Sequence, residues 1–360
     1  IEDSDGRIQV YIKKDEVGDS LYNIFKLLDI GDFIGVNGFV FKTKTKEISV
    51  HAKSITVLAK SIRPLPIVKE KDGETFDSFE DKEQRYRNRH LDLIVNPEVK
   101  EVFRKRTIIT SALRSYLDNE GFLEVETPVL QPLYGGANAR PFKTHHNTLD
   151  QTLYLRIADE LYLKRLIIGG IDKVYELSKD FRNEGMDRNH NPEFTMLEWY
   201  EAYSDYNDQM NRVEDIIRFV ANSIDKMKFD WGDVSIDLSK KFDRKPYLDL
   251  LKDATGEHLL EAGVKKLRSV CNENSIEISN KENYGQLLDE LMRRLVEPNL
   301  TQPVFIIDHP REISPLAKSH RSGEVKLVER FELFIGGAEF ANSFSELNDP
   351  LDQRDRLENQ

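Results

Sequence analysis

The order of the expected secondary-structure elements constrains the fold of this chain more than any other feature. Residues 61–66, Ser-Ile-Arg-Pro-Leu-Pro, divide the chain, because each proline fixes its φ angle and disfavours helix in the residue before it. Before this segment, short runs of apolar residues predict strands at 6–12, 32–42 and 47–58. After it, expected helices and strands mix without the alternation of repeated βαβ units. We therefore expect a small β domain followed by an α+β fold with an antiparallel sheet.

The second part of the chain contains both kinds of periodicity. A hairpin is expected where Gly336-Gly337 separates two strand-like runs, 328–335 and 338–347, since paired glycines favour tight hairpin turns. Helices are expected at 107–120, 159–168, 206–226, 262–273 and 282–296. Further strands are expected at 122–130, strand-like up to Pro128, and at 152–157, 174–181, 194–203 and 304–307.

Charge is distributed unevenly along the chain. The formal net charge is −12, which by itself argues against a nucleic-acid partner. Residues 1–110, however, hold 20 Lys and Arg against 19 Asp and Glu, so the acidity lies in the rest of the chain. Residues 42–69 hold seven basic side chains and one acid, Glu47. The β domain is therefore either an oligonucleotide-binding (OB) barrel or a β-sandwich with a solvated lysine face.

The composition excludes several other classes of protein. Cys271 is the one cysteine in the sequence, which excludes a disulfide framework and a cysteine-based zinc site, and points to a reducing compartment. No apolar stretch approaches the ~18 residues that a membrane-spanning helix needs. The first twenty residues lack the apolar core of a signal peptide. We therefore expect a cytoplasmic protein that does not enter a membrane.

The expected strand at 194–203 carries an unusual set of side chains. Alternate residues of a strand share a face, so Phe194, Met196, Glu198 and Tyr200 should lie together. An unpaired buried Glu198 would cost several kcal/mol, so this carboxylate needs a cation. Arg182, at the end of the preceding strand, offers one, and a structural Arg182–Glu198 pair and a cationic ligand are equally compatible with the spacing.

Three further acids lie on or near the expected hairpin. A two-residue turn at Gly336-Gly337 places Glu332 opposite Ala341, with Glu339 as its diagonal neighbour about 7 Å away. Such a pair either faces solvent or holds a divalent cation, and Mg²⁺ with bound phosphates would suit it. Strict alternation puts Asn342, Phe344 and Glu346 on the opposite face, so a pocket shared with Glu339 would require a β-bulge.

Several segments of the sequence resemble one family. Phe181-Arg182-Asn183-Glu184, followed by residues 190–200, resembles motif 2 of the class II aminoacyl-tRNA synthetases in its lysyl-tRNA synthetase form. Residues 121–130 resemble motif 1, with its proline at Pro128. The segments 135–137, 141–147, 155–164, 314–318 and 342–349 also resemble lysyl-tRNA synthetases, so the resemblance covers nearly the whole chain.

This resemblance implies a two-step reaction. Lysine and ATP give lysyl-adenylate and pyrophosphate, and the lysyl group then moves to tRNA(Lys). Arg182 would be the catalytic residue, Mg²⁺ would be held by Glu332 and Glu339, and a homodimer would form through motif 1. The implied ATP-binding residues are Arg182, Glu184, His190, Asn191, Phe194, Glu332 and Glu339, and the implied lysine-binding residues are Gly136, Glu160, Arg182, Glu198, Tyr200, Asn342, Phe344 and Glu346, with Glu198 or Glu346 near the ε-ammonium.

The resemblance also implies the domain organisation. Residues 1–62 would be an anticodon-binding OB domain that contacts RNA through Gln9, residues 63–90 a linker, and residues 91–360 the catalytic domain. Three departures accompany it. Motif 3, a Gly-x-Gly-x-Asp-Arg segment, is absent, the first OB strand would precede Ile1, and Ser54 occupies a position where the family has an anticodon-contacting glutamate. We therefore expect a chain that is incomplete at both ends.

Other functions remain compatible with parts of this pattern. Aspartyl- and asparaginyl-tRNA synthetases share the architecture, but cationic groups rather than Glu198 and Glu346 should surround their substrate side chains. The lysyl ligase that modifies an elongation factor lacks an anticodon barrel, so the first 60 residues count against it. A non-catalytic RNA-binding or regulatory paralogue would be a chain of a different class, without motif 3.

Overall fold

A computed structural model describes residues 1–66, 69–71, 74–76 and 79–358 of the chain. Its internal contacts divide it into two units, Ile1–Arg104 and Lys105–Gln360. The expected linker, 63–90, belongs to the first unit, and the residues 67–68, 72–73 and 77–78 within it lie outside the described part of the chain.

The first unit contains a three-stranded sheet in the order β1–β3–β2. Strands β1 (Gln9–Tyr11), β2 (Phe33–Lys42) and β3 (Ile48–Ala59) confirm the three predicted strands. β1 pairs in parallel with β3, whereas β2 and β3 pair antiparallel with irregularities after Phe33 and Asn37. Helix α1 (Lys14–Phe25), between β1 and β2, was not predicted. The remaining elements are β4 (Lys69–Lys71), β5 (Glu74–Phe76), α2 (Lys82–Arg87) and α3 (Arg89–Val95).

The second unit begins in helix α4 (Glu98–Asn119), which starts nine residues before its predicted position and crosses the division between the units. The predicted continuous strand at 122–130 is wrong. The segment forms two short strands, β6 (Leu123–Glu124) and β7 (Leu130–Gln131). Between them the Val125 N–H still donates to the Tyr175 carbonyl at 2.9 Å, but the Thr127 N–H donates to the Glu176 carboxylate at 3.1 Å and Pro128 has no N–H. Strands β8 (Lys143–His146) and β9 (Gln151–Leu155) complete a small sheet with β7.

The central part of this unit is the sheet β11–β10–β6. Strand β10 (Lys173–Phe181) pairs antiparallel with β11 (Glu193–Glu201), as predicted, and runs parallel to β6. Tyr175 of β10 packs with Leu117 of α4, Phe122 and Ile216, forming an apolar core on one face of the sheet. Two helices of this part were also predicted, namely α5 (Glu160–Ile168) and α6 (Tyr206–Ser223).

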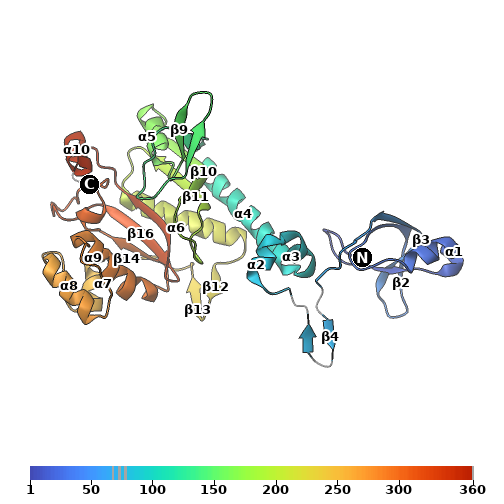
Figure 1. Cartoon of the computed structure of the whole chain (residues 1–360). Helices are drawn as coiled ribbons and strands as arrows, with labels where there is room; N and C mark the ends of the chain where they lie inside the picture. The colour runs from blue at the N-terminus through green and yellow to red at the C-terminus, as the bar shows by residue number, and fades with distance from the viewer. Residues whose placement is uncertain (67–68, 72–73, 77–78, 359–360) are drawn as a thin grey trace. The chain divides into compact units, whose positions relative to one another are not determined.

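A four-stranded sheet in the order β14–β15–β16–β17 forms the rest of the unit. β14 (Asp243–Pro246) is parallel to β15 (Val304–Ile307), and the other neighbours are antiparallel. Figure 1 shows helices α7 (Tyr247–Thr255), α8 (Val264–Glu273) and α9 (Tyr284–Leu291) gathered beside β14 and β16. Phe334 packs among these helices, whereas Phe331 and Leu333 pack toward α6 on the other face. Further elements are β12 (Lys228–Trp231), β13 (Val234–Asp237), a π-helix Met292–Val296, the 3₁₀ turns Glu297–Asn299 and Arg311–Ile313, and α10 (Pro350–Glu358).

The hairpin of β16 (Arg330–Ile335) and β17 (Ala338–Phe344) corrects the predicted register. Gly336 and Gly337 form the turn, and their φ angles of +62° and +75° fit a tight turn that needs positive φ at both central positions. A β-bulge follows, so that Phe334 faces Glu339 but Leu333 faces Ala341. Glu332 is therefore opposite Asn342 rather than Ala341. This is the bulge that a pocket shared by Glu339 and Asn342 required.

Candidate active site

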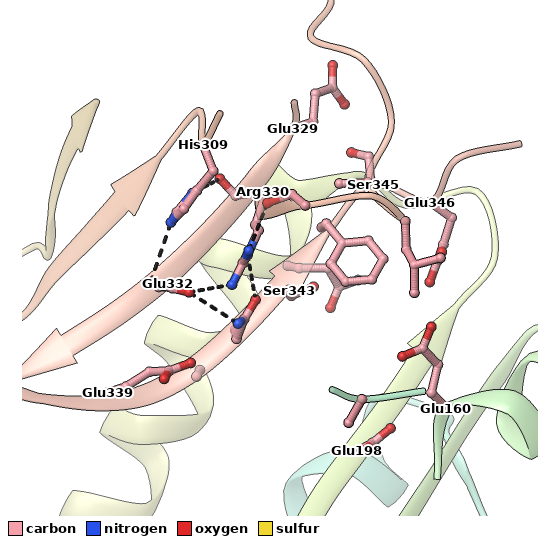
Figure 2. Close-up of a pocket in the computed structure, with 18 of the residues that line it drawn as sticks. Glu160, Glu198, His309, Glu329, Arg330, Glu332, Glu339, Ser343, Ser345 and Glu346 are labelled. Carbon is pink, nitrogen blue, oxygen red and sulfur yellow. Dashed lines mark hydrogen bonds and ion pairs between the residues drawn. The ribbon is translucent and has the colours of Figure 1, made fainter. Parts of the chain in front are cut away.

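A cavity of about 2230 Å³ lies in the second unit, lined from the strands β11, β16 and β17, the start of α5 and the loop around Gly136. All eight residues expected to bind lysine line it: Gly136, Glu160, Arg182, Glu198, Tyr200, Asn342, Phe344 and Glu346. In Figure 2, Glu160, Glu198 and Glu346 gather at one end, while Glu332 and Glu339 lie at the other. The cavity thus has two separate acidic ends.

The β10–β11 pair positions one wall of the cavity. Glu176 pairs with Glu198 and Asp180 with Phe194, and directly opposed residues of an antiparallel pair share a face. The pairing is continuous along β11, without a bulge, so the alternate residues Phe194, Met196, Glu198 and Tyr200 share a face as predicted. The Arg182 guanidinium lies over the Phe194 ring, 5.1 Å from its centroid. This arrangement presents a cation and an aromatic ring to the same space.

Glu198 has partners but no counter-ion. Its Oε1 accepts a hydrogen bond from the Asp159 N–H at 3.3 Å, and its Oε2 accepts one from the Tyr200 hydroxyl at 3.3 Å. Among the residues that the structure describes, no lysine or arginine forms an ion pair with it, so the Arg182–Glu198 pair is not formed. Burial, together with the nearby Asp159 carboxylate, raises the pKa of Glu198 to about 8. Glu198 is thus a carboxyl group poised to accept a cation.

Glu160 and Glu346 share a cation that comes from the protein. Lys164 Nζ lies 2.5 Å from Glu160 Oε1 and 2.9 Å from Glu346 Oε2. Glu160 and Lys164 lie four residues apart on α5, a spacing that brings their side chains together on a helix. Lys164 was missed in the sequence, although this spacing was a usable signal.

Gly136 approaches Glu160 so closely that even an added Cβ would crowd it. Its φ is +88°, a conformation that favours glycine. A Cβ at this position would lie 3.0 Å from the Glu160 Cβ and 3.2 Å from the Ala158 Cβ. The absence of a side chain at Gly136 keeps this end of the cavity open beside Glu160.

At the other end, Glu332 is tightly held. Arg330 Nη2 donates to Glu332 Oε1, Asn342 Nδ2 donates to the same oxygen at 3.3 Å, and His309 Nε2 lies 3.5 Å from Oε2. Burial raises the pKa of Glu332, but His309 and Arg330 outweigh it and hold that pKa below its usual range. Arg330 shares a strand face with Glu332, since the two are two residues apart, and this was a missed sequence signal.

Further acids surround Glu332. Burial and the Glu332 charge raise the pKa of Glu339, and burial with the same charge raises the pKa of Glu297 to about 7. The pKa of Asp289 is raised for the same two reasons. Asp289 and Glu297 were not predicted as site residues, because they come from the α9 region, distant in sequence from the hairpin. In the described residues Glu339 forms no ion pair, so this end holds carboxyl groups that no protein cation pairs with.

A buried charge network lies behind Glu198. Arg156 Nη1 lies 2.7 Å from Glu176 Oε1 and 3.1 Å from Asp159 Oδ1, and Arg156 Nε lies 3.2 Å from Asp180 Oδ1. Oxygens of Asp159, Asp180 and Glu198 all lie within 4.8 Å of one another. Burial and the negative charge of Asp159 raise the pKa of Asp180. Arg156 is thus the cation that neutralises part of this cluster.

Other predicted site residues lie elsewhere. Glu184, His190 and Asn191 are exposed in the loop between β10 and β11 and do not line the cavity. His190 Nδ1 lies 2.8 Å from Asp187 Oδ2, Asn191 Nδ2 donates to the Glu193 carbonyl at 2.6 Å, and Glu184 accepts from the Arg140 N–H at 3.3 Å. In the first unit, Gln9 is exposed and accepts a hydrogen bond from the Ser49 hydroxyl at 2.8 Å.

Comparison with known families decides the relationship. The family described as tRNA synthetases class II (D, K and N) matches residues 81–360. The chain belongs to this family. An OB-fold nucleic acid binding domain matches residues 1–58. Together these matches confirm the predicted α+β class II synthetase fold preceded by an OB-fold domain.

The class II chain is also similar to individual curated proteins. It is 50% identical to the lysine–tRNA ligases of two strains of Porphyromonas gingivalis, over 367 aligned positions. The aligned region covers 100% of this chain and 63% of each relative. The chain therefore spans less than two thirds of the length of these relatives.

None of the helices in the described residues is both long and apolar enough to cross a membrane.

Proposed function

We propose that this chain is the lysine-activating and tRNA-binding part of a lysine–tRNA ligase. The observation that carries the proposal is the acidic end of the cavity, where Glu160, Glu198 and Glu346 lie together. A cavity end lined by carboxylates favours a substrate bearing ammonium groups, because an uncharged analogue would leave Glu198 without a counter-ion. The relatives named lysine–tRNA ligase support the same substrate.

In the first step, an oxygen of the lysine carboxylate attacks the α-phosphorus of ATP. A new O–P bond forms, the bond to the bridging oxygen breaks, and pyrophosphate leaves with that bond's electron pair. Arg182 is the protein group for this step, since a planar guanidinium can bind the carboxylate and the α-phosphate and stabilise developing charge. Its position over Phe194 fits adenine stacking on that ring. Glu184, His190 and Asn191 would then contact ATP through movement of their loop.

Magnesium would bind at the opposite end. Glu332 and Glu339 offer the carboxylate oxygens that Mg²⁺ prefers. Burial and the Glu332 charge raise the pKa of Glu339, and a cation between the two carboxylates would relieve their repulsion. A bound Mg²⁺ supplies charge neutralisation for the ATP phosphates. The protein's own part is to hold the Glu332 carboxylate in place through Arg330, His309 and Asn342.

The first unit would bind the anticodon region of tRNA(Lys). Its match to nucleic-acid-binding OB folds, the basic residues of β2, β3 and their turn, and exposed aromatic side chains such as Phe33 and Phe39 support this role. Gln9 is the residue that we assign to RNA contact. We propose the domain division 1–62, 63–90 and 91–360, and a cytoplasmic location as for other proteins of translation.

A homodimer would form around motif 1. Apolar side chains near this motif are exposed in the isolated chain, among them Leu123 at 53% and Leu133 at 79%. Exposed apolar groups clustered along one segment are typical of surfaces that another subunit covers.

Pyrophosphate exchange tests the proposed function. The complete protein should catalyse ATP–pyrophosphate exchange with lysine among a panel of the twenty amino acids, and E198A should reduce that exchange. The matched control E277A, an exposed glutamate outside the cavity, should leave it unchanged. Exchange with aspartate or asparagine but not lysine would assign the chain to those synthetases. No exchange with any amino acid would support a non-catalytic RNA-binding paralogue.

A further inference from the structure

The Lys164 ammonium group lies beside the acidic end of the cavity that we assign to the lysine substrate. Lys164 Nζ bridges Glu160 Oε1 and Glu346 Oε2, which come from α5 and from the segment that follows β17. It also lies over the Phe344 ring, 5.6 Å from the centroid. A single internal cation thus touches three residues of the pocket that we assign to the lysine substrate.

Lys164 contacts these residues without being part of the cavity lining. Glu160, Phe344 and Glu346 all line the cavity, whereas Lys164 does not. Each carboxylate uses one oxygen for Lys164, namely Oε1 of Glu160 and Oε2 of Glu346, which leaves its other oxygen available. An ionised carboxylate accepts several hydrogen bonds, so pairing with Lys164 does not exhaust either acid.

Electrostatics explains why such a cation is needed. Glu160 and Glu346 face each other across the end of the cavity (Figure 2), and two partly buried carboxylates repel when no cation separates them. Burial raises the pKa of Glu346, and Lys164 opposes that rise, whereas the Glu160 charge adds to it. Burial lowers the pKa of Lys164, but Glu346 and Glu160 outweigh it and raise that pKa, so the ammonium stays charged.

We propose that Lys164 is a positioning residue for lysine recognition, an internal ammonium that holds Glu160 and Glu346 ionised and aimed into the cavity. This inference rests on the proposed function. It differs from a competitor role, in which Lys164 would occupy the substrate's place and its removal would tighten lysine binding. The position of Lys164 outside the lining favours the positioning role.

Steady-state ATP–pyrophosphate exchange with the complete protein tests the inference in three variants. K164M keeps the side-chain length but removes the charge, K164R keeps the charge, and the control K266M removes an exposed lysine that pairs with Glu257 at 2.7 Å outside the cavity. K164M should raise the KM for lysine by about 10-fold or more, with the KM for ATP little changed, and it should lose some stability because Glu160 and Glu346 lose their shared cation. K164R should recover part of the loss, and K266M should match the wild type.

The pH profile adds a readout that a merely structural role would not move. Without Lys164, the pKa of Glu346 should rise, so the acid limb of kcat/KM for lysine should shift to higher pH in K164M but not in K266M. An unchanged or lowered lysine KM in K164M, with lysine-dependent exchange in the wild type, overturns this inference alone. An equal rise in the KM for ATP would also overturn it. A wild type without lysine-dependent exchange overturns the proposed function, and this inference with it.

Discussion

Glu332 lies directly opposite Asn342 in the β16–β17 hairpin, and the Asn342 amide donates to the Glu332 carboxylate at 3.3 Å. The bulge between this pair and the Phe334–Glu339 pair turns Glu339 toward the same side of the sheet. One inserted residue therefore joins the acids assigned to Mg²⁺ and the residues assigned to the lysine pocket in a single cavity.

The first prediction concerns the Mg²⁺ requirement. E332Q and E339Q should each raise the Mg²⁺ concentration that gives half-maximal ATP–pyrophosphate exchange, by about 10-fold or more, since each removes a charged oxygen ligand. Titration of MgCl₂ at fixed ATP measures this, and E277Q, an exposed glutamate outside the cavity, is the control. An unchanged Mg²⁺ requirement in both variants would show that Glu332 and Glu339 do not bind the metal.

The hairpin also shows what sequence patterns can and cannot predict. The Gly336-Gly337 turn and the strands β16 and β17 follow from the local sequence pattern, and all three were predicted. The bulge was recognised only as a condition for a shared pocket, because it depends on how β17 packs and not on residues that stand out in its sequence. Helix α1 was missed. It is interrupted at Gly18, whose φ of +82° is not helical, and Val17 is its one buried residue, so its sequence offers no uninterrupted apolar face.

The second prediction tests the close approach at Gly136. G136A should raise the KM for lysine about 10-fold or more, because the added Cβ would crowd Glu160 at 3.0 Å. G170A is a matched control, since Gly170 also has a positive φ, +98°, but a Cβ there meets nothing within 4 Å. Both variants should lose some stability from backbone strain. Equal lysine KM values in G136A and G170A would refute a steric role for Gly136 in the pocket.

Parts of the candidate site were predictable because they lie on regular elements. Alternation along β11 placed Phe194, Glu198 and Tyr200 on one face, and the register with β10 confirms it. The cations could not be placed in the same way. Arg156 and Lys164 each have one partner nearby in sequence, Asp159 and Glu160, but no periodic rule links Arg156 to Asp180 or Lys164 to Glu346. Long-range ion pairs are thus the part of the site that the fold alone supplies.

The third prediction concerns the buried charge network. Arg156 has a side chain only 4% exposed, and it contacts the carboxylates of Asp159, Glu176 and Asp180. R156M would leave these acids without a cation, so the free energy of unfolding should fall by about 3–5 kcal/mol. Urea unfolding followed by circular dichroism measures the change. R294M, which removes an exposed arginine paired with Glu290 at 3.1 Å, should change stability by less than about 1 kcal/mol. Equal effects of the two substitutions would contradict the role given to Arg156.

The last prediction uses proton release to decide which glutamate receives the ε-ammonium. With a pKa of about 8, the Glu198 carboxyl is mostly protonated at pH 7 before lysine binds. An ammonium group favours the ionised form, so binding lowers this pKa and the proton leaves. Calorimetric titration with lysine at pH 7, in buffers of different ionisation enthalpy, should therefore show proton release when lysine binds. Above pH 8 the carboxylate is already ionised, so the release should fade, and lysine affinity should rise with pH until that point.

Two variants separate Glu198 from its neighbour in this measurement. E198Q has no proton to lose, so the release should disappear together with much of the lysine affinity. E346Q should bind lysine more weakly but still release the proton, because Glu346 is already paired with Lys164 at 2.9 Å. Loss of proton release in E346Q with its retention in E198Q would move the ε-ammonium to Glu346. Binding without any proton release in the wild type would mean that lysine leaves the Glu198 carboxyl protonated, and that its ammonium groups pair only with Glu160 and Glu346.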